Sequence, residues 1–280
     1  SPRQGRAGRR VRGVGDAVRG VRVGFRPAEH LLEDVCTIVF AWQAFPDTPV
    51  AVAANRDEAL DRPSEPPSIV DSDPRVLAPT DGEAGGTWIG YNEADVVVAV
   101  TNRWTDSDLP GERSRGLLVR DALRYQSAEA AVRHVEEELD RRTYEAFNLV
   151  VTDPTAALFV EYDGGVRIRN LDPGVHVVGN TGADGQYAIP RRRREHAEEQ
   201  AANLDTLRAA LAPDPGESAG AWLDRAGAAL SDHSYGVCIH GEGFGTRSSS
   251  LLSIGSEGAS YRFADGPPCE TAYRPVESQI

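Results

Sequence analysis

Lysine and methionine are absent from this 280-residue chain, so all 30 of its basic residues are arginine. Without lysine the chain cannot form a Schiff base, use a P-loop lysine or build a serine–lysine dyad. A net charge of −13 argues against a nucleic-acid surface as the main function, so we expect no nucleic-acid partner. The acid-rich, lysine-free composition predicts a halophilic protein from an acidic proteome, adapted to high salt.

Cysteine is also scarce, with Cys36, Cys238 and Cys269 far apart in the chain. This odd, sparse set gives no disulfide framework and no CxxC metal motif, and it favours a reducing cytoplasm. The six histidines follow no metal-ligand spacing, so we expect no metal and no cofactor. A Cys–His dyad stays open, because its partners would meet only in space. No apolar run approaches membrane-spanning length, so no membrane insertion is expected.

Residues 1–35 differ in composition from the rest, with eight arginines against four acidic residues and no regular apolar period. A signal peptide or a twin-arginine export signal would need a continuous apolar segment, which is missing here. A basic arm that tethers nucleic acid is another interpretation of this segment. We interpret residues 1–35 as a disordered basic extension, arising from a misplaced translation start or removed as a propeptide. Residues 36–280 are then the folded domain.

From Cys36 onward the pattern predicts strands that follow one another through tight turns, interrupted by pairs of helices. This order favours an α+β fold with antiparallel sheets over a doubly wound parallel sheet. Residues 61–84 look like a Pro/Asp-rich loop with a short strand near Val76. The expected strands lie at 36–43, 49–58, two within 85–104, 146–153, 156–163, 166–170, 174–180, 235–241, 248–255 and 259–265, and the expected helices at 116–125, 128–142, 191–211 and 219–230.

Two glycine-containing motifs have ordinary structural explanations. Residues 216–220 match the G-x-S-x-G pattern of a nucleophile elbow, but no buried strand precedes them. We therefore expect a helix start capped by Ser218 or a neighbour. Residues 241–247 are glycine-rich, but neither a helix nor a lysine follows, so a β-turn that places Arg247 at a strand entrance is expected.

Cys36 begins the first expected strand, where a cysteine is commonly just a buried core residue. The second expected strand ends in the run Asn55-Arg56-Asp57-Glu58. In a hairpin, the end of the second strand lies near the start of the first, so this polar run should lie close to Cys36. Asn102 and Asn180 also end apolar strands, as simple turn formers or as donors to a developing oxyanion.

The chain resembles the NRDE proteins, the transport-and-Golgi-organization family, through eight short motifs in order. The resemblance spans about residues 36–280, and its motifs are CTIVFAW, AANRDE, RPS, GGTWIG, AVTN, AFNLVVTD, VVGN and GFGTRSSSLLSI. That family is similar to the N-terminal nucleophile (Ntn) hydrolases, which implies an αββα sandwich of two antiparallel sheets flanked by helices. Within that superfamily the sequence looks closest to the choloylglycine (bile-salt and penicillin V) amidases.

The resemblance implies roles for particular residues. Cys36 matches the nucleophile, whose own α-amine serves as base. Asp57 matches the acid that orients this amine, with Asn55 in support. Asn102 and Asn180 match the oxyanion donors, through a backbone N–H and a side-chain amide respectively.

The resemblance also implies arginines near the nucleophile. Arg247 matches the arginine near the thiolate. The choloylglycine enzymes have a further arginine where this chain has Ala54. Strand alternation predicts that Arg56 points toward a different face, so we do not expect it to replace that arginine.

Together, these roles predict a thiol amidohydrolase that cleaves a small-molecule amide through an acyl-thioester intermediate. An α-amine with an ordinary pKa near 8 accepts a thiol proton at neutral pH. The amine must be free, which requires Cys36 to be the first residue, and a GTG start codon at Val35 would achieve this. A non-catalytic binding or trafficking protein, handling haem or lipid-like metabolites, is the alternative on the same scaffold. The sequence gives neither the substrate nor the oligomeric state.

Overall fold

Two antiparallel sheets form the centre of the computed structural model, which describes residues 36–277 and Ile280. The expected extension over residues 1–35, with the start-site hypothesis at Val35, lies outside the described residues. The eight-stranded sheet has the order β12-β11-β10-β1-β2-β13-β14-β15, and the seven-stranded sheet runs from β3 to β9 in sequence order. The strands are β1 Thr37–Phe45, β2 Thr48–Ala59, β3 Ser64–Ser72, β4 Arg75–Asp81, β5 Ile89–Asn92, β6 Val97–Asn102, β7 Phe147–Thr152, β8 Ala157–Tyr162, β9 Val166–Asn170, β10 Gly174–Val178, β11 Gly182–Ala183, β12 Gln186–Tyr187, β13 Phe244–Gly255, β14 Gly258–Ala264 and β15 Arg274–Pro275.

The helices begin at the caps that their sequences supply. Ser127 accepts a hydrogen bond from the backbone N–H of Ala130, as expected from its position before the apolar period. Ser218 caps α4 (Ala219–Ser231) in the same way, so residues 216–220 are a helix start and not a nucleophile elbow. Within the described part of the chain, no helix is both long and apolar enough to cross a membrane. The helices are α1 Arg115–Ala122, α2 Ala128–Leu139, α3 Arg194–Ala210 and α4 Ala219–Ser231, with short 3₁₀ turns η2 Arg191–Arg193 and η3 His233–Tyr235.

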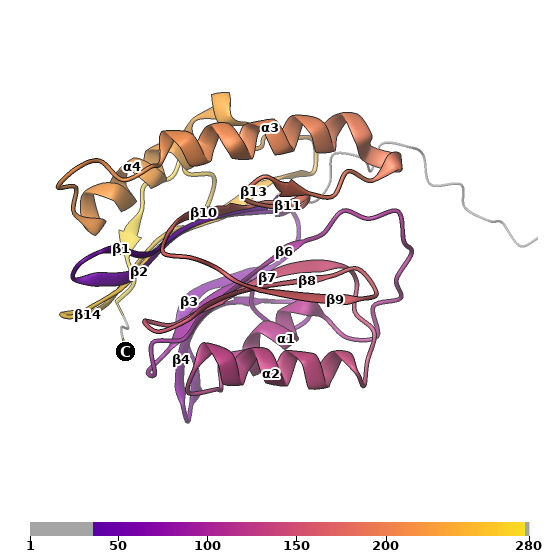
Figure 1. Cartoon of the computed structure of the whole chain (residues 1–280), viewed down its shortest axis with the longest axis horizontal. Coiled ribbons are helices and arrows are strands. Elements are labelled where there is room, and N and C mark those ends of the chain that lie inside the picture. The colour runs from indigo at the N-terminus through magenta and orange to yellow at the C-terminus, as the bar shows by residue number, and fades with distance from the viewer. Residues whose placement is uncertain (1–35, 278–279) are drawn as a thin grey trace, which may run out of the picture. The chain divides into compact units, whose positions relative to one another are not determined.

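Three apolar layers hold the sheets and helices together (Figure 1). The first lies between the two sheets and contains Phe40 from β1 and Phe159 from β8. The second lies between the seven-stranded sheet and helices α1 and α2, and the third between the eight-stranded sheet and helices α3 and α4. Alternate residues of β1 and β2 therefore face different layers, which requires apolar side chains on both faces. The expected α+β fold with an αββα arrangement is confirmed.

Two segments differ from the sequence-based expectation. Residues 61–84 contain a full strand pair, β3 and β4, instead of a loop with one short strand. β3 is an edge strand, where Pro66 and Pro67 are tolerated because one row of N–H groups needs no partner. Residues 235–241 do not form the expected strand, because Gly236 adopts a left-handed conformation (φ 63°) and only His240 pairs, through a single bridge to Gly245.

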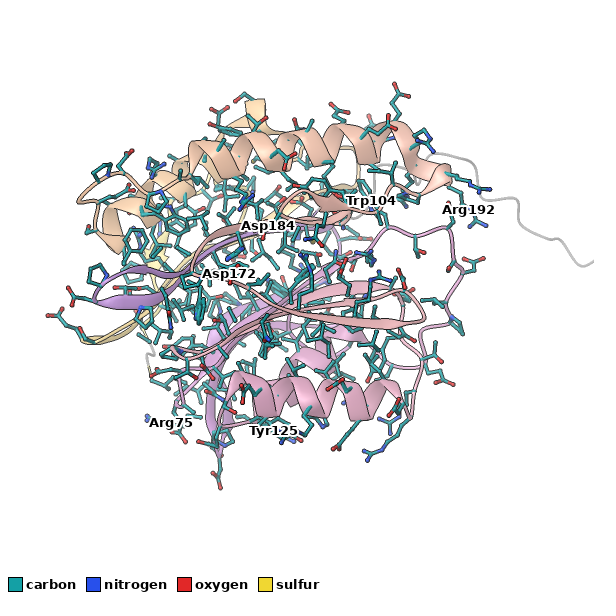
Figure 2. The ribbon with its side chains drawn as sticks, in the orientation of Figure 1. Arg75, Trp104, Tyr125, Asp172, Asp184 and Arg192 are labelled. Carbon is teal, nitrogen blue, oxygen red and sulfur yellow. The ribbon has the colours of Figure 1, made fainter. Side chains whose placement is uncertain are left out.

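A partly buried acid, Asp184 after β11, holds the segment around β10 in place. His176 Nδ1 lies 2.6 Å from Asp184 Oδ2, and its Nε2 lies 2.8 Å from the carbonyl oxygen of Asp172. Asp184 also accepts a hydrogen bond from the backbone N–H of Val177. Figure 2 shows Asp172 and Asp184 on the connections next to this strand. The turn they hold carries Asn180, one of the candidate site residues.

Candidate active site

Cys36 lies immediately before β1, beside the end of β2. Thr37 pairs with Asn55 in the antiparallel ladder, so Cys36 faces the residues that follow Asn55. The Cys36 thiol donates to the carbonyl oxygen of Asp57 over 3.7 Å. The hairpin therefore brings the Asn-Arg-Asp-Glu run to Cys36, as its sequence pattern predicted.

A cavity of about 100 Å³ opens beside Cys36 and is lined mainly by polar and charged side chains. Both basic and acidic groups line it, so it suits a small polar ligand better than a large apolar one. The lining residues from the eight-stranded sheet and the turn after β2 are Cys36, Arg56, Asp57, Glu58 and Arg62. Those from the facing sheet, its loops and the start of α1 are Asp81, Thr87, Trp88, Val100, Asn102, Ser114, Arg115 and Gly116.

Asp57 is buried at this cavity, with 2% of its surface exposed. Its Oδ1 accepts a short hydrogen bond from the Thr246 hydroxyl, while its Oδ2 has no hydrogen-bond partner among the described residues. Burial raises the pKa of the Asp57 carboxyl well above its usual range, and the Thr246 hydrogen bond and the Arg56 charge oppose that rise. The carboxyl thus has one oxygen available for a further donor.

Asn180 joins the backbone of Cys36 to that of Asn102. The Cys36 N–H donates to Asn180 Oδ1 over 3.2 Å, and Gln200 Nε2 donates to the same oxygen over 2.9 Å. Asn180 Nδ2 in turn donates to the carbonyl oxygen of Asn102 over 3.0 Å. These bonds fix the orientation of the Asn180 amide, with its oxygen toward Cys36 N and its nitrogen toward the second sheet.

Arg56 lies in the cavity, which corrects the expectation about its face. Positions 54 and 56 are two residues apart on β2, so their side chains share the face between the sheets. Ala54 packs in that layer, and the Arg56 guanidinium lies 4.1 Å from the centre of the Trp88 ring. Burial lowers the pKa of Arg56, and the nearby charges of Glu58 and Cys36 oppose this effect. Arg56 can therefore supply the positive charge that position 54 lacks.

Arg247 and Asn55, also expected at the site, do not line this cavity. Arg247 falls at an irregularity between β13 and β2, where the register shifts between Thr246 and Ser248. Asn55 points toward the helical layer, where its Nδ2 donates to the carbonyl oxygens of Leu230 and Val237 at 2.9 and 2.7 Å. Asn55 thereby ties β2 to the end of α4 and the segment after it.

A buried polar network behind Asn180 was missed by the sequence reasoning. Asn148 Nδ2 donates to the carbonyl oxygen of Gly179 over 2.8 Å, and its Oδ1 accepts from Arg103 NH1. Arg103 also pairs with Glu161 at 2.8 Å. The only sequence signal was Asn148 inside the apolar run AFNLVVTD, since a buried polar residue needs partners. The network supports the turn that positions Asn180.

The three cysteines differ in their surroundings. Cys238 is buried, and burial together with a hydrogen bond to Cys269 raises the pKa of its thiol to about 12. A thiol with that pKa stays protonated near neutral pH and reacts slowly. Cys36 instead borders the charged cavity beside Arg56.

Two stacked antiparallel sheets between helical layers, with a cysteine at the start of the central hairpin, define an αββα sandwich protein. The family model for Transport and Golgi organisation 2 matches residues 35–265, and the chain belongs to this family. The chain is 30% identical over 133 residues to the Transport and Golgi organization 2 homolog of Mus musculus, covering 42% of this chain and 45% of the relative. It is 27% identical over 259 residues to the homolog of Bos taurus, covering 80% and 90%.

Solved structures similar to this chain include an acylase, an acid amidase and a bile acid hydrolase. A penicillin V acylase from Agrobacterium tumefaciens is 15% identical, with a TM-score of 0.48 and coverage of 82% of this chain and 83% of that one. The N-acylethanolamine-hydrolyzing acid amidase ortholog of Caenorhabditis elegans is 12% identical, with a TM-score of 0.47 and coverage of 78% and 92%. A mutant conjugated bile acid hydrolase from Clostridium perfringens is 10% identical, with a TM-score of 0.44 and coverage of 87% and 97%. The activities in these names belong to those proteins.

Proposed function

We propose that this chain is an Ntn-type amidohydrolase that uses Cys36 as the nucleophile on a small-molecule amide. The observation that carries the proposal is the arrangement around the Cys36 nitrogen. Asn180 Oδ1 accepts from it, and the buried Asp57, with Oδ2 unpartnered in the described residues, lies in the same cavity. An α-ammonium at Cys36 has three donors, and these two oxygens would satisfy two of them.

The proposal requires Cys36 to be the first residue of the active form. In that form the α-amine takes the thiol proton, and the positive charges of the ammonium and Arg56 stabilise the thiolate. The thiolate attacks the amide carbonyl carbon and forms a C–S bond. The C–N bond then breaks, and the leaving amine takes the proton back from the α-ammonium.

Hydrolysis of the thioester completes the cycle. The α-amine removes a proton from water, the resulting hydroxide attacks the acyl carbon, and the thiolate leaves with its electron pair and is reprotonated. Donors at Asn180 Nδ2 and at the Asn102 backbone would stabilise the oxyanion of each step. The proposed cycle requires no cofactor and no metal, and we place it in the reducing cytoplasm, where a thiol nucleophile persists.

The charge of Arg56 suggests the substrate class. Its NH1 is buried without a partner among the described residues, and its NH2 lies 3.5 Å from Glu58. A substrate with a carboxylate or a carbonyl group near the scissile amide would satisfy NH1. We therefore expect N-acyl compounds with an acceptor group close to the amide, such as N-acyl amino acids, to be better substrates than neutral N-alkyl amides.

The test compares chains that begin at Cys36 with the 280-residue chain. Both are incubated with a thiol-directed acylating probe and with a panel of N-acyl amino acids, and the labelled residue is located by peptide mass spectrometry. We expect rapid labelling at Cys36 and amine release only from the chain that begins at Cys36. Cys36→Ser should lose both signals, while Gly165→Ala, whose added Cβ meets no atom within 4 Å, should retain both.

Equal labelling of Cys36, Cys238 and Cys269, with no amine release, would refute the hydrolase. That outcome would favour the alternative, a binding or trafficking protein on the same scaffold. Intact mass of the native protein is the companion measurement. A mass that corresponds to all 280 residues in an active preparation would contradict the requirement for a free amine at Cys36.

A further inference from the structure

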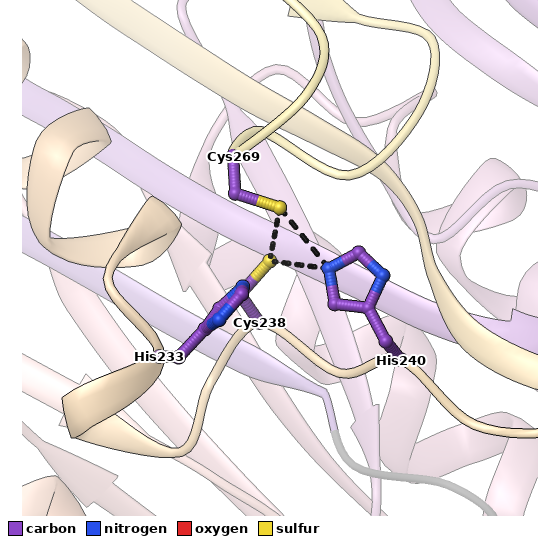
Figure 3. Close-up of side chains that lie close together, drawn as sticks. All are labelled: His233, Cys238, His240 and Cys269. Atoms are coloured by element: carbon purple, nitrogen blue, oxygen red, sulfur yellow. Dashed lines mark hydrogen bonds between the residues drawn. The ribbon is translucent and has the colours of Figure 1, made fainter.

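A second group of side chains with ligand chemistry lies outside the Cys36 cavity. Figure 3 shows His233, Cys238, His240 and Cys269 converging from three segments of the chain. Their candidate ligand atoms all lie within 4.8 Å of one another. The two sulfurs are 3.5 Å apart, and His240 Nε2 lies 3.1 Å from the Cys269 sulfur and 3.8 Å from the Cys238 sulfur.

These separations suit a tetrahedral metal ion. Zinc binds sulfur at about 2.3 Å and imidazole nitrogen at about 2.0–2.1 Å, so the edges of a Cys₂His₂ tetrahedron measure roughly 3.4–3.8 Å. The three distances among the two sulfurs and His240 Nε2, at 3.1, 3.5 and 3.8 Å, fall around that range. Small side-chain rotations would equalise them.

The backbone around the cluster is held by other contacts. Asn55 binds the carbonyl oxygens of Leu230 and Val237 on either side of η3, which carries His233. His240 forms a bridge to Gly245. On the third segment, the backbone N–H groups of residues 270 and 271 donate to the carbonyl oxygen of Pro267, which makes a turn around Cys269. The four ligands therefore sit on ordered segments.

We propose that His233, Cys238, His240 and Cys269 bind one zinc ion in a structural Cys₂His₂ site. Each thiol gives up its proton on coordination, so two thiolates neutralise the charge of the ion and the two imidazoles stay neutral. Four protein ligands fill the tetrahedron and leave no position for substrate, which distinguishes this site from a catalytic zinc site. The ion fastens the C-terminal segment that carries Cys269 to the loop that follows α4.

The site explains how an exposed segment is held. Cys269, His233 and His240 are exposed, so apolar burial contributes little to the contact among these segments. A metal link between Cys238 and Cys269, which are 31 positions apart, closes a long loop, and such links stabilise the folded state most. Zinc binding is then part of the folding free energy of this region.

The experiment measures bound zinc in the full chain. Protein purified with a phosphine reductant is loaded with zinc chloride, passed over a chelating resin and analysed by mass spectrometry of the metal. We expect one zinc ion per chain in the wild type and in the matched control Cys36→Ser, and a loss of at least tenfold in Cys238→Ser and Cys269→Ser. Circular dichroism checks that each variant is folded.

Cobalt substitution in the wild type supplies a readout that does not depend on variant folding. Tetrahedral Co²⁺ with two thiolates should give strong visible absorption and a thiolate charge-transfer band, both abolished by one equivalent of zinc. Wild-type chain that retains no zinc, or folded variants that retain the full amount, would overturn the proposal. A Cys238–Cys269 disulfide in freshly isolated protein that zinc does not displace under reductant would overturn it as well.

Discussion

Asp57→Asn should change stability with opposite signs in two forms of this protein. In the 280-residue chain the Cys36 nitrogen is a peptide N–H that already donates to Asn180, and Asp57 Oδ2 is buried without a partner in the described residues. In a chain that begins at Cys36, the same nitrogen becomes an ammonium with further donors and a positive charge. The substitution removes a destabilising buried charge in the first form and one partner of a buried ion pair in the second.

The burial of Asp57 sets the size of the expected changes in unfolding free energy. The asparagine amide at this position is still unpartnered but carries no charge, so at a pH above the raised pKa of Asp57 the substitution should raise the unfolding free energy of the 280-residue chain by about 1–2 kcal/mol. Removal of one partner from a buried ion pair costs about 3–5 kcal/mol. The chain that begins at Cys36 should therefore lose about 3 kcal/mol, and its amidase activity with it.

The pH dependence of the unfolding free energy is an independent test, because it predicts whether stability rises or falls with pH. Burial raises the folded-state pKa of Asp57 above its ordinary value of 3.8, so the folded 280-residue chain binds this proton more tightly than the unfolded chain does. The contribution of Asp57 to stability is then fully present below pH 3.8 and is lost as the pH rises through the raised pKa. Asp57→Asn should remove that decline. In the chain that begins at Cys36, the ammonium should lower the pKa of Asp57, so that stability should instead increase as the pH rises.

Urea unfolding followed by tryptophan fluorescence, at pH 5 and pH 8, measures all four combinations of chain and variant. Thr246→Val is the control for loss of the Oδ1 hydrogen bond, and it should destabilise both forms. If Asp57→Asn destabilises both forms equally at both pH values, the carboxyl has the same partner with and without the free amine. The proposed role of Asp57 would then be wrong.

Three further predictions concern packing, the network behind Asn180 and salt. Gly86→Ala should lower the unfolding free energy by about 2 kcal/mol, because its Cβ would lie 2.3 Å from the backbone of Gly116, whereas Gly165→Ala meets no atom within 4 Å and should be neutral in urea unfolding. Asn148→Ala removes one of the two 2.8 Å partners of Arg103 NH1 and the donor to the Gly179 carbonyl, and it should cost about 1–3 kcal/mol by the same assay, with a higher KM in the active form if Asn180 shifts. The charge of −13 predicts that dialysis from molar potassium chloride into dilute buffer lowers the thermal unfolding midpoint, and an unchanged midpoint by circular dichroism would contradict halophilic adaptation.

Local sequence signals were sufficient for the parts of the fold that depend on neighbours in sequence. The β1–β2 hairpin follows from two apolar runs around a turn, and Ser127 marks the start of α2 because its hydroxyl satisfies a backbone donor. β3 was missed because Pro66 and Pro67 argue against a strand unless its position at a sheet edge is known. Strand pairing order is a tertiary property, so single-strand patterns could not supply it.

The candidate site also combines features that local sequence predicts with features that depend on the tertiary structure. The proximity of Cys36 to Asp57 follows from hairpin geometry alone. The convergence of Asn102 and Asn180 depends on how two sheets stack, and only the family resemblance brought these residues together beforehand. The histidine and cysteine cluster had no sequence signal at all, because its ligands come from three segments and match no established spacing.

The contacts of Thr246 determine which oxygen of Asp57 is available for chemistry. The Thr246 hydroxyl accepts from the backbone N–H of Ile239 over 2.9 Å, so its single hydrogen is directed to Asp57 Oδ1. Oδ1 is therefore an acceptor, and a proton or an ammonium must meet Asp57 at Oδ2. Ile239 lies between Cys238 and His240, so an ion bound to that pair would hold the N–H that sets this direction. The proposed metal site would in this way keep Asp57 oriented for the Cys36 amine, without contact with the substrate.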